Sequence, residues 1–158
     1  SKDIREELVA RTGRGLQSLS DYSVSLERLA ITSYDLKQPE LVESYLSKDK
    51  DVLKEIISKT CSYDLLDDLL KSVYIAQYCE KWEYGQEFLR YARDTLEQLY
   101  SSGTEVERFR LSSLSSKYAR LSTLNVWNGV NSGVFDKRAY EDLFVDPVSY
   151  THLTLPTN

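Results

Sequence analysis

Residues 62–103, SYDLLDDLLKSVYIAQYCEKWEYGQEFLRYARDTLEQLYSSG, carry the strongest helical pattern in the chain. The stretch holds six of the twelve tyrosines and one of the two tryptophans. At about 100° per residue, the apolar positions around Leu69 and those around Leu96 fall on different sides of a helix, and the buried side changes near Trp82. Residues 64–101 as one helix would be about 57 Å long, nearly twice the width of a small domain. Two structures fit this change: a straight helix covered by different partners at its two ends, or a break in KWEYG that gives a helical hairpin near residues 82–86. Gly85 favours the break.

The residues before this stretch predict two further helices. In residues 3–36, apolar residues spaced three and four apart form one stripe, and glycine weakens the helix before Leu16. The stripe consists of Leu16, Leu19, Tyr22, Leu26 and Leu29. Pro39 predicts the end of this helix and the start of a second near Glu40, which we expect to continue to about Lys59. Its charged interval SKDKD, residues 47–51, is either a solvated helical face or a short break.

Helix-capping residues mark the boundaries on both sides of the central stretch. Ser62 is a candidate N-cap, and Gly103 is a candidate C-terminal cap. Thr104 and Glu107 have the spacing of a capping box, which predicts a third flanking helix that ends near Val126 in the turn-forming segment NVWNGVNSG. A short last helix, KRAYEDLF at residues 137–144, follows Asp136 as its expected cap.

The composition agrees with an all-α fold. The chain has 158 residues, of which 41% are hydrophobic and 28% charged, with six glycines and three prolines, which is typical of a globular helical protein. We therefore expect an antiparallel helical bundle of four to six helices that forms a single domain over residues 1–145. The net charge of −5 disfavours a nucleic-acid partner, because that binding requires clustered cations. No stretch of the chain is apolar enough to predict a membrane span.

The last residues differ from the rest of the chain. Residues 148–157, VSYTHLTLPT, carry no charge and include the chain's only histidine. The segment resembles a translated adaptor used in preparing DNA sequencing libraries. This resemblance implies that residues 146–158 are a non-native, disordered tail on a fragment of a longer protein, and that His152 should be discounted. A genuine extended tail is the alternative.

The remaining residues do not form a recognisable catalytic pattern. Without His152 there is no histidine for a triad, a general base or a metal site. Asp64, Asp67 and Asp68 could be carboxylates of an acid/base or metal site, but acids at a helix start also favour the positive end of the helix dipole. Cys61 and Cys79 fit neither a zinc site nor a disulfide scaffold, and we expect both to be buried. We therefore expect no enzyme, cofactor or metal in this chain.

A binding surface is the remaining kind of site that the pattern indicates. Aromatic residues with a polar tip are common in ligand pockets and partner surfaces, although at helical spacing they are more often packed in a core. Basic residues after residue 107 could contact an acidic partner or could form a solvated face. The candidate residues for a ligand or partner surface are Tyr78, Trp82, Tyr84, Tyr91, Arg110, Lys117 and Arg120.

Two resemblances suggest functions of different classes. In residues 1–46, IREELVARTGRGLQSLSDYSVSLERLAITSYDL and the following ELVESYL resemble the leading helix of bacterial sensor-kinase and chemoreceptor ectodomains. That resemblance implies an extracytoplasmic sensory domain for a protein or small-molecule ligand. In the central stretch, AQYCEKWEYGQEFLRYARDTLEQL resembles a tetratricopeptide helix pair, although its spacing departs from that consensus. This second resemblance implies a cytoplasmic helical scaffold that binds another protein, and a homodimer is compatible with either hypothesis.

Overall fold

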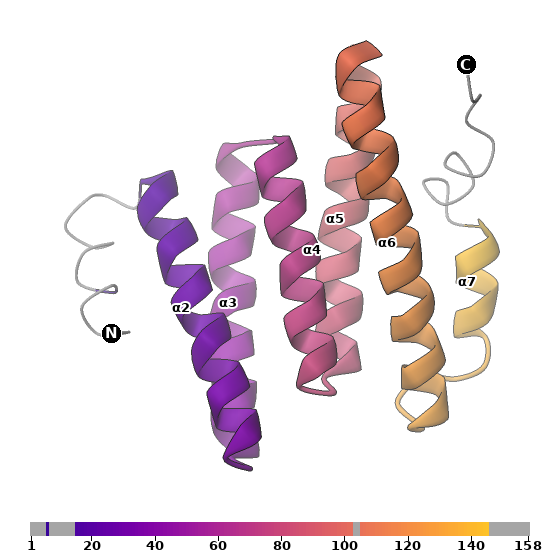
Figure 1. The fold of residues 1–158 in the computed structure, drawn as a ribbon. Helices are drawn as coiled ribbons and strands as arrows, with labels where there is room; N and C mark the ends of the chain where they lie inside the picture. The colour runs from indigo at the N-terminus through magenta and orange to yellow at the C-terminus, as the bar shows by residue number, and fades with distance from the viewer. Residues whose placement is uncertain (1–5, 7–14, 103–104, 146–158) are drawn as a thin grey trace. The chain divides into compact units, whose positions relative to one another are not determined.

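The described part of the protein is all-α, with short turns and connections between the helices. The computed structural model describes residue 6, residues 15–102 and residues 105–145, and it has no strand in that part. The described ranges form six helices (Figure 1): α2 (Leu16–Asp35), α3 (Pro39–Lys59), α4 (Tyr63–Tyr78), α5 (Trp82–Ser102), α6 (Glu105–Asn131) and α7 (Ala139–Val145). The predicted all-α helical bundle is thereby confirmed.

The chain divides into two compact units. One consists of Ser1–Thr60 with Tyr78–Glu80, and the other of Cys61–Gln77 with Lys81–Asn158. The first unit therefore contains α2 and α3, and the second contains almost all of α4 together with α5, α6 and α7. The expectation of a single domain over residues 1–145 remains a prediction.

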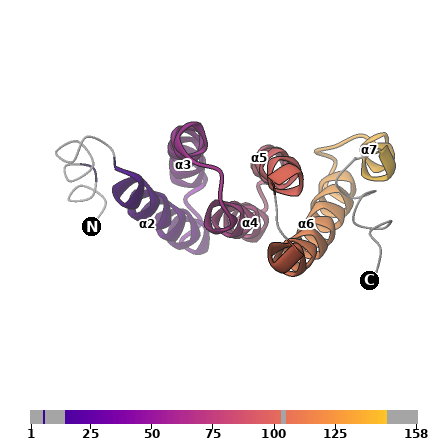
Figure 2. The ribbon, with the colours of Figure 1, turned by 90° about the horizontal axis from the view of Figure 1, so that it is seen from above.

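In the first unit, α2 and α3 pack against each other along their length (Figures 1 and 2). The predicted apolar stripe of α2 is confirmed at Leu19, Tyr22 and Leu26, which are buried. It is wrong at Leu16, which is 44% exposed. Leu16 is the first residue of α2, where the helix has no preceding turn in the described part to cover the side chain.

The ends of α2 and the start of α3 follow the predicted signals. Gly15 precedes the first helical residue in an extended conformation. At the other end, Lys37 has a positive φ of 58°, and the Gln38 N–H donates to the Ser33 carbonyl at 2.9 Å. This bond closes the helix as a Schellman motif does. Pro39 then occupies the first turn of α3, as expected for a residue without an N–H to satisfy.

The charged interval of α3 is neither a break nor wholly solvated. The helix is continuous from Pro39 to Lys59, which confirms its predicted extent. Asp49, in the middle of the interval, is completely buried, so the interpretation of a solvated face is wrong at this residue. Helical phase explains the difference, since Asp49 lies three or four residues from the core positions Leu46, Val52 and Leu53.

The long central pattern is two helices, so a helical hairpin is present as predicted, but its turn lies at residues 79–81 and not at the predicted residues 82–86. α4 ends at Tyr78 and α5 starts at Trp82, and they run in opposite directions in Figure 1. Glu80 has a φ of 55°, and the Lys81 N–H donates to the Ala76 carbonyl at 2.9 Å. The assignment of the break to Gly85 is wrong, because Gly85 is buried inside α5.

In the second unit, hydrogen bonds that join pairs of helices show how these helices are aligned. Near its start α4 contacts α6 through Asp64 and Arg110, and near its end through Gln77 and the Leu121 carbonyl, so these two helices run parallel. α5 runs antiparallel to α6, because Trp82 contacts Asn125 and Tyr100 contacts Ser115. Figures 1 and 2 place α4 and α6 in one layer of this unit and α5 and α7 in the other.

The prediction that the α6 helix ends near Val126 is wrong, because it continues to Asn131. Two of the turn-forming residues have specific contacts within the folded helix. Asn125 is buried and hydrogen-bonded to α5, and Gly129 provides space for the ring of Phe135. The helix ends before Gly133, which has a φ of 80°. The proposed caps Gly103 and Thr104, and the tail at residues 146–158, lie outside the described residues.

Candidate functional site

The first candidate residue, Tyr78, belongs to an aromatic and acidic cluster at the end of α2. Its hydroxyl donates to Asp35 Oδ1 at 2.9 Å, and its ring lies edge-on to the Tyr34 ring with centroids 5.7 Å apart. The Tyr34 hydroxyl donates to the Glu80 carboxylate, and this hydrogen bond, with smaller contributions from burial and nearby charge, raises the pKa of Tyr34 to about 12. Both tyrosine hydroxyls are thus engaged within the first unit. This arrangement gives Tyr78 a structural role in holding the turn Tyr78–Glu80 against α2.

Two further candidate tyrosines, Tyr84 and Tyr91, pack around Phe88 on α5. The ring centroids of Tyr84 and Tyr91 lie 6.2 and 6.4 Å from that of Phe88, which is fully buried. Burial and the neighbouring Glu87 carboxylate raise the pKa of Tyr91, whereas Arg90 lowers it. These contacts are typical of aromatic residues that pack in a core and keep a polar hydroxyl group at its edge. Of the two expected roles, core packing and a binding surface, they favour core packing.

Trp82 borders a buried hydrogen-bond node centred on Asn125. The Asn125 amide donates to the Trp82 carbonyl at 2.9 Å and to Gln86 Oε1 at 3.0 Å. Gln77 donates to Asn125 Oδ1 at 3.4 Å and to the Leu121 carbonyl at 2.9 Å. Asn125 is 0% exposed, so these bonds satisfy a polar side chain that would otherwise destabilise the interior. The node connects α4, α5 and α6 and is structural.

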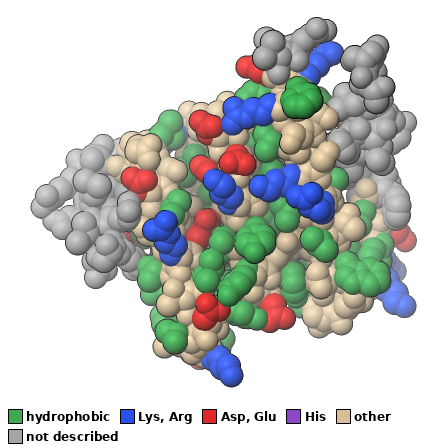
Figure 3. All heavy atoms as spheres, viewed as in Figure 1, with side chains coloured by type: hydrophobic (Ala, Val, Ile, Leu, Met, Phe, Trp, Pro, Cys, Tyr) green, Lys and Arg blue, Asp and Glu red, His purple; other side chains and the backbone are tan. Residues whose placement is uncertain are grey.

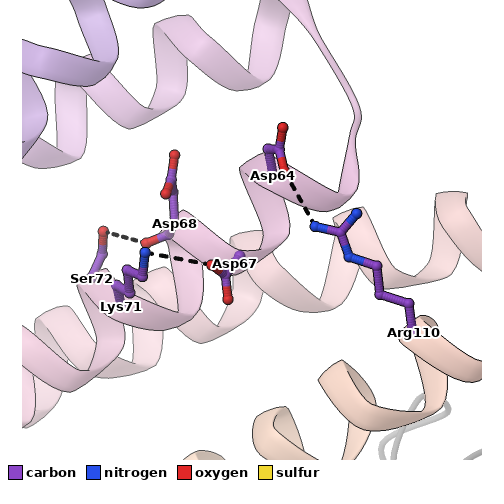
Figure 4. Close-up of polar contacts among 6 residues, drawn as sticks. All are labelled: Asp64, Asp67, Asp68, Lys71, Ser72 and Arg110. Carbon is purple, nitrogen blue, oxygen red and sulfur yellow. Dashed lines mark hydrogen bonds and ion pairs between the residues drawn. The ribbon is translucent and has the colours of Figure 1, made fainter.

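The acidic residues at the start of α4 do not share one site (Figure 4). The Leu65 N–H donates to Ser62 Oγ at 3.1 Å, which confirms Ser62 as the N-cap. Asp64 pairs with Arg110 at 3.2 Å, and Asp67 pairs with Lys71 at 3.5 Å. In Figure 4 the side chains of Asp64 and Asp68 extend to one side of α4 and that of Asp67 to another, so the three carboxylates do not converge on one point. The described residues contain no group of three or more acidic, Cys or His side chains arranged to hold a metal ion.

Arg110 is therefore engaged, whereas the other two candidate cations are available. Its guanidinium lies 5.0 Å from the centroid of the Tyr63 ring in addition to its pair with Asp64. Lys117 and Arg120 follow on the same helix, half-buried and exposed respectively. Within the described part of the chain, neither has an ion-pair partner.

Sequence reasoning missed the apolar residues that accompany these cations on α6. Phe109 is 85% exposed, Trp127 is 56% exposed and Leu124 is 45% exposed. At about 100° per residue, Phe109 and Trp127 share one angular position, roughly 160° from the centre of the predicted buried face. That phase difference was available in the sequence as a signal of exposed aromatic residues. We name Phe109, Lys117, Arg120, Leu124 and Trp127 the α6 stripe.

The seven predicted surface residues do not form one site. Arg110, Lys117 and Arg120 share α6, Tyr84 and Tyr91 pack along α5, and Trp82 lies at the Asn125 node. Figure 3 shows Lys and Arg side chains gathered over α4 and α6, with hydrophobic side chains near them. The α6 stripe is thus the best candidate surface.

Two further expectations concern the cysteines and the membrane. Cys79 is buried as expected, but Cys61 is exposed in the connection between α3 and α4, so that prediction is wrong. Neither cysteine forms a disulfide within the described part of the chain. None of the helices in the described ranges combines the length and the apolar character that a membrane crossing requires.

Comparison of the chain with protein-family models, with curated proteins and with solved structures finds no match. The resemblances of residues 1–46 to receptor ectodomains, of the central stretch to a tetratricopeptide helix pair and of residues 148–157 to an adaptor therefore remain predictions.

Proposed function

We propose that the chain is a protein-interaction domain that binds an acidic, amphipathic helical segment of a partner protein along the α6 stripe. The observation that carries this proposal is the exposure of Phe109 and Trp127 on the face of α6 that also presents Lys117 and Arg120. Exposed aromatic residues at an interface supply most of the binding energy when a partner buries them.

The dimensions of the stripe suit a helical partner. Phe109 and Trp127 are 18 residues apart, which corresponds to about 27 Å along a helix. This length accommodates a partner helix of about five turns, with apolar anchors at both ends of the contact. The hydrogen-bond register also places Tyr74 of α4, which is exposed, at the level of Arg120. Tyr74 can therefore widen the contact surface beside the stripe.

The charges of the stripe favour an acidic partner. Lys117 and Arg120 lie between the apolar anchors and are not neutralised by a described carboxylate. Partner carboxylates at this level would pair with them and would select against basic segments. The chain as a whole has a net charge of −5, so the attraction is local to this surface.

A peptide selection with the full chain tests the proposal. We expect a displayed library of helical peptides to yield binders with apolar residues at helical spacing and acidic residues between them. Phe109→Ala together with Trp127→Ala should reduce their affinity by tenfold or more, because anchor residues at interfaces contribute about 2 kcal/mol or more each. Lys117→Glu with Arg120→Glu should slow association and reduce its dependence on salt.

Matched substitutions in the first unit provide the control. Leu36 and Lys54 are exposed residues of the first unit and do not belong to the α6 stripe. Leu36→Ala and Lys54→Glu should leave peptide affinity unchanged. Selected peptides that bind the doubly substituted Phe109 and Trp127 variant as well as the wild type would refute the proposal. Concentration-dependent dimers that disappear in that variant would instead assign the stripe to a second copy of the chain.

A further inference from the structure

A buried acidic pair lies between α2 and α3, apart from the proposed binding surface. Asp49 of α3 is 0% exposed, and Glu27 of α2 is 9% exposed. Ser23, one turn before Glu27, donates from Oγ to Asp49 Oδ1 at 2.5 Å. Asp49 Oδ2 is buried and has no hydrogen-bond partner. An ionised carboxylate in this position would leave one charged oxygen in the interior without compensation, which is strongly unfavourable.

The surroundings of Asp49 favour its neutral form. Burial raises the pKa of Asp49 well above its ordinary value, the negative charge of Glu27 raises it further, and the hydrogen bond from Ser23 acts in the opposite direction. Glu27 is the charged group on α2 that acts on Asp49. The neighbours of Asp49 along α3 are Lys48, which is exposed, and Lys50, which is half-buried. Two close carboxylates in a shielded environment do not both ionise readily.

We infer that Glu27 and Asp49 hold a proton between them over a pH range in which an exposed aspartate is ionised, and that loss of this proton weakens the α2–α3 hairpin. The unpartnered Oδ2 is the atom where the proton is least costly, because no N–H or O–H group donates to it. The hairpin is thereby a pH-responsive element whose two halves are contributed by different helices.

The direction of the response follows from proton linkage. In the unfolded chain Asp49 would ionise near pH 4, the value of an exposed aspartate. Between that pH and the raised pKa of the folded state, the folded protein binds more protons than the unfolded one, so stability falls as the pH rises. The stabilising contribution of the proton is complete below about pH 4 and is lost as the pH passes through the pKa of the folded pair.

Carboxyl carbon NMR of the full chain measures the titration of Asp49 directly, with Asp49→Asn used to assign its signal. We expect its midpoint to lie well above the value of about 4 that is usual for an exposed aspartate. Glu27→Gln should lower the midpoint by removing a like charge, and Ser23→Ala should raise it by removing the hydrogen bond to the ionised form. A merely structural role for these residues would not move the midpoint in opposite directions.

Equilibrium unfolding at pH 5 and pH 8 measures the consequence for stability. Relative to Asp49→Asn, which carries a permanently neutral amide, the wild type should show an unfolding constant that increases by about tenfold or more across this interval, since one unit of pKa shift corresponds to a factor of ten. Asp51→Asn is the matched control and should retain the wild-type dependence. If Asp49→Asn does not fold, Glu27→Gln replaces it and should reduce the dependence. An Asp49 midpoint near about 4, the usual value of an exposed aspartate, or identical pH dependences for wild type and Asp49→Asn, would overturn the inference.

Discussion

Gly85 of α5 lies directly against the side chain of Asn125 on α6, so that a Cβ atom at residue 85 would come within 2.2 Å of Asn125 Oδ1. Asn125 cannot move away freely, because its amide is held by the Trp82 carbonyl and Gln86. The glycine is therefore required by the close approach of two helices and not by a turn. This relationship explains why a residue that suggests a helix break is found inside a helix.

Gly85→Ala should destabilise the second unit. The added methyl group must displace Asn125 or push α5 from α6, and overpacking of this kind typically costs about 1–3 kcal/mol. Urea unfolding followed by circular dichroism measures the effect. Gly15→Ala is the matched control, because a Cβ atom there has no atom within 4 Å, and it should change stability much less.

A double-mutant cycle separates the steric conflict from a general loss of helix packing. Asn125→Ala alone should destabilise, because it leaves the half-buried side chain of Gln77 without one of its partners. Combined with Gly85→Ala, it removes the atom that the new methyl group would meet. The double variant should therefore lose less stability than the sum of the losses measured for Gly85→Ala and Asn125→Ala. Strict additivity would contradict the assignment of the Gly85 effect to Asn125.

Leu96→Ala should destabilise the protein by about 2–5 kcal/mol, as is usual when a fully buried leucine is truncated. Leu96 is 0% exposed on α5, on the side predicted from the helical phase of the second half of the central stretch. Leu124→Ala on α6 provides the comparison, because Leu124 is largely exposed. Thermal or urea unfolding should show the larger loss for Leu96→Ala. A change below about 0.5 kcal/mol, the range of surface substitutions, would show that this face is not the core.

Gly129→Ala should perturb the segment that follows α6. A Cβ atom at residue 129 would lie 2.1 Å from the Phe135 ring, and the Gly129 carbonyl accepts hydrogen bonds from the N–H groups of Val134 and Phe135. Displacement of this turn should also disturb the contact between the Trp127 and Tyr140 rings, whose centroids are 6.2 Å apart. Tryptophan fluorescence should therefore shift in Gly129→Ala. Gly15→Ala is the control and should show no shift. If Gly129→Ala shows no shift either, the packing of this segment against Gly129 is contradicted.

Tyr34 should ionise later than an ordinary tyrosine as the solution becomes alkaline. Its hydrogen bond to Glu80 raises its pKa to about 12. The folded state therefore retains this proton above the ordinary tyrosine pKa of about 10, and the stabilisation associated with it is lost between about pH 10 and pH 12. Tyr34 is only half-buried, so solvent screening should keep the effect on stability small.

Absorbance near 295 nm, where tyrosinate absorbs, measures this ionisation. The difference between wild type and Tyr34→Phe should show a step near pH 12, and Glu80→Gln should move that step to lower pH. Tyr74→Phe removes an exposed tyrosine of α4 and is the control, because it should leave the step near pH 12 unchanged. A Tyr34 step that does not respond to Glu80→Gln would show that the hydrogen bond is not its cause.

Several features of the fold could be predicted because their causes are local. Pro39 starts α3, Ser62 caps α4, and the change of apolar face near Trp82 reflects two helices rather than one. Each of these signals depends on residues within a few positions of one another. The position of the turn before α5 could not be predicted in the same way, since Glu80 adopts the left-handed conformation without being a glycine.

The candidate surface was only partly predictable. Lys117 and Arg120 were expected as candidates, whereas the exposed Phe109 and Trp127 were not. Helical phase contains the information that these aromatic residues oppose the core. It does not contain the information that Arg110 is engaged by Asp64 and Tyr63, because that contact joins two helices.

The sequence by itself determined the all-α class, the approximate helices and most of the buried leucines, because helix formation and amphipathic periodicity depend on neighbouring residues. Only the tertiary structure decided the roles of Gly85, Asn125 and Asp49. Gly85 and Asn125 depend on the distance between α5 and α6, and Asp49 depends on the face of α2 that carries Ser23 and Glu27. Gly85 suggests a turn and Asp49 suggests a solvated face. Because another helix packs against each of them, Gly85 instead lies inside a helix and Asp49 is buried.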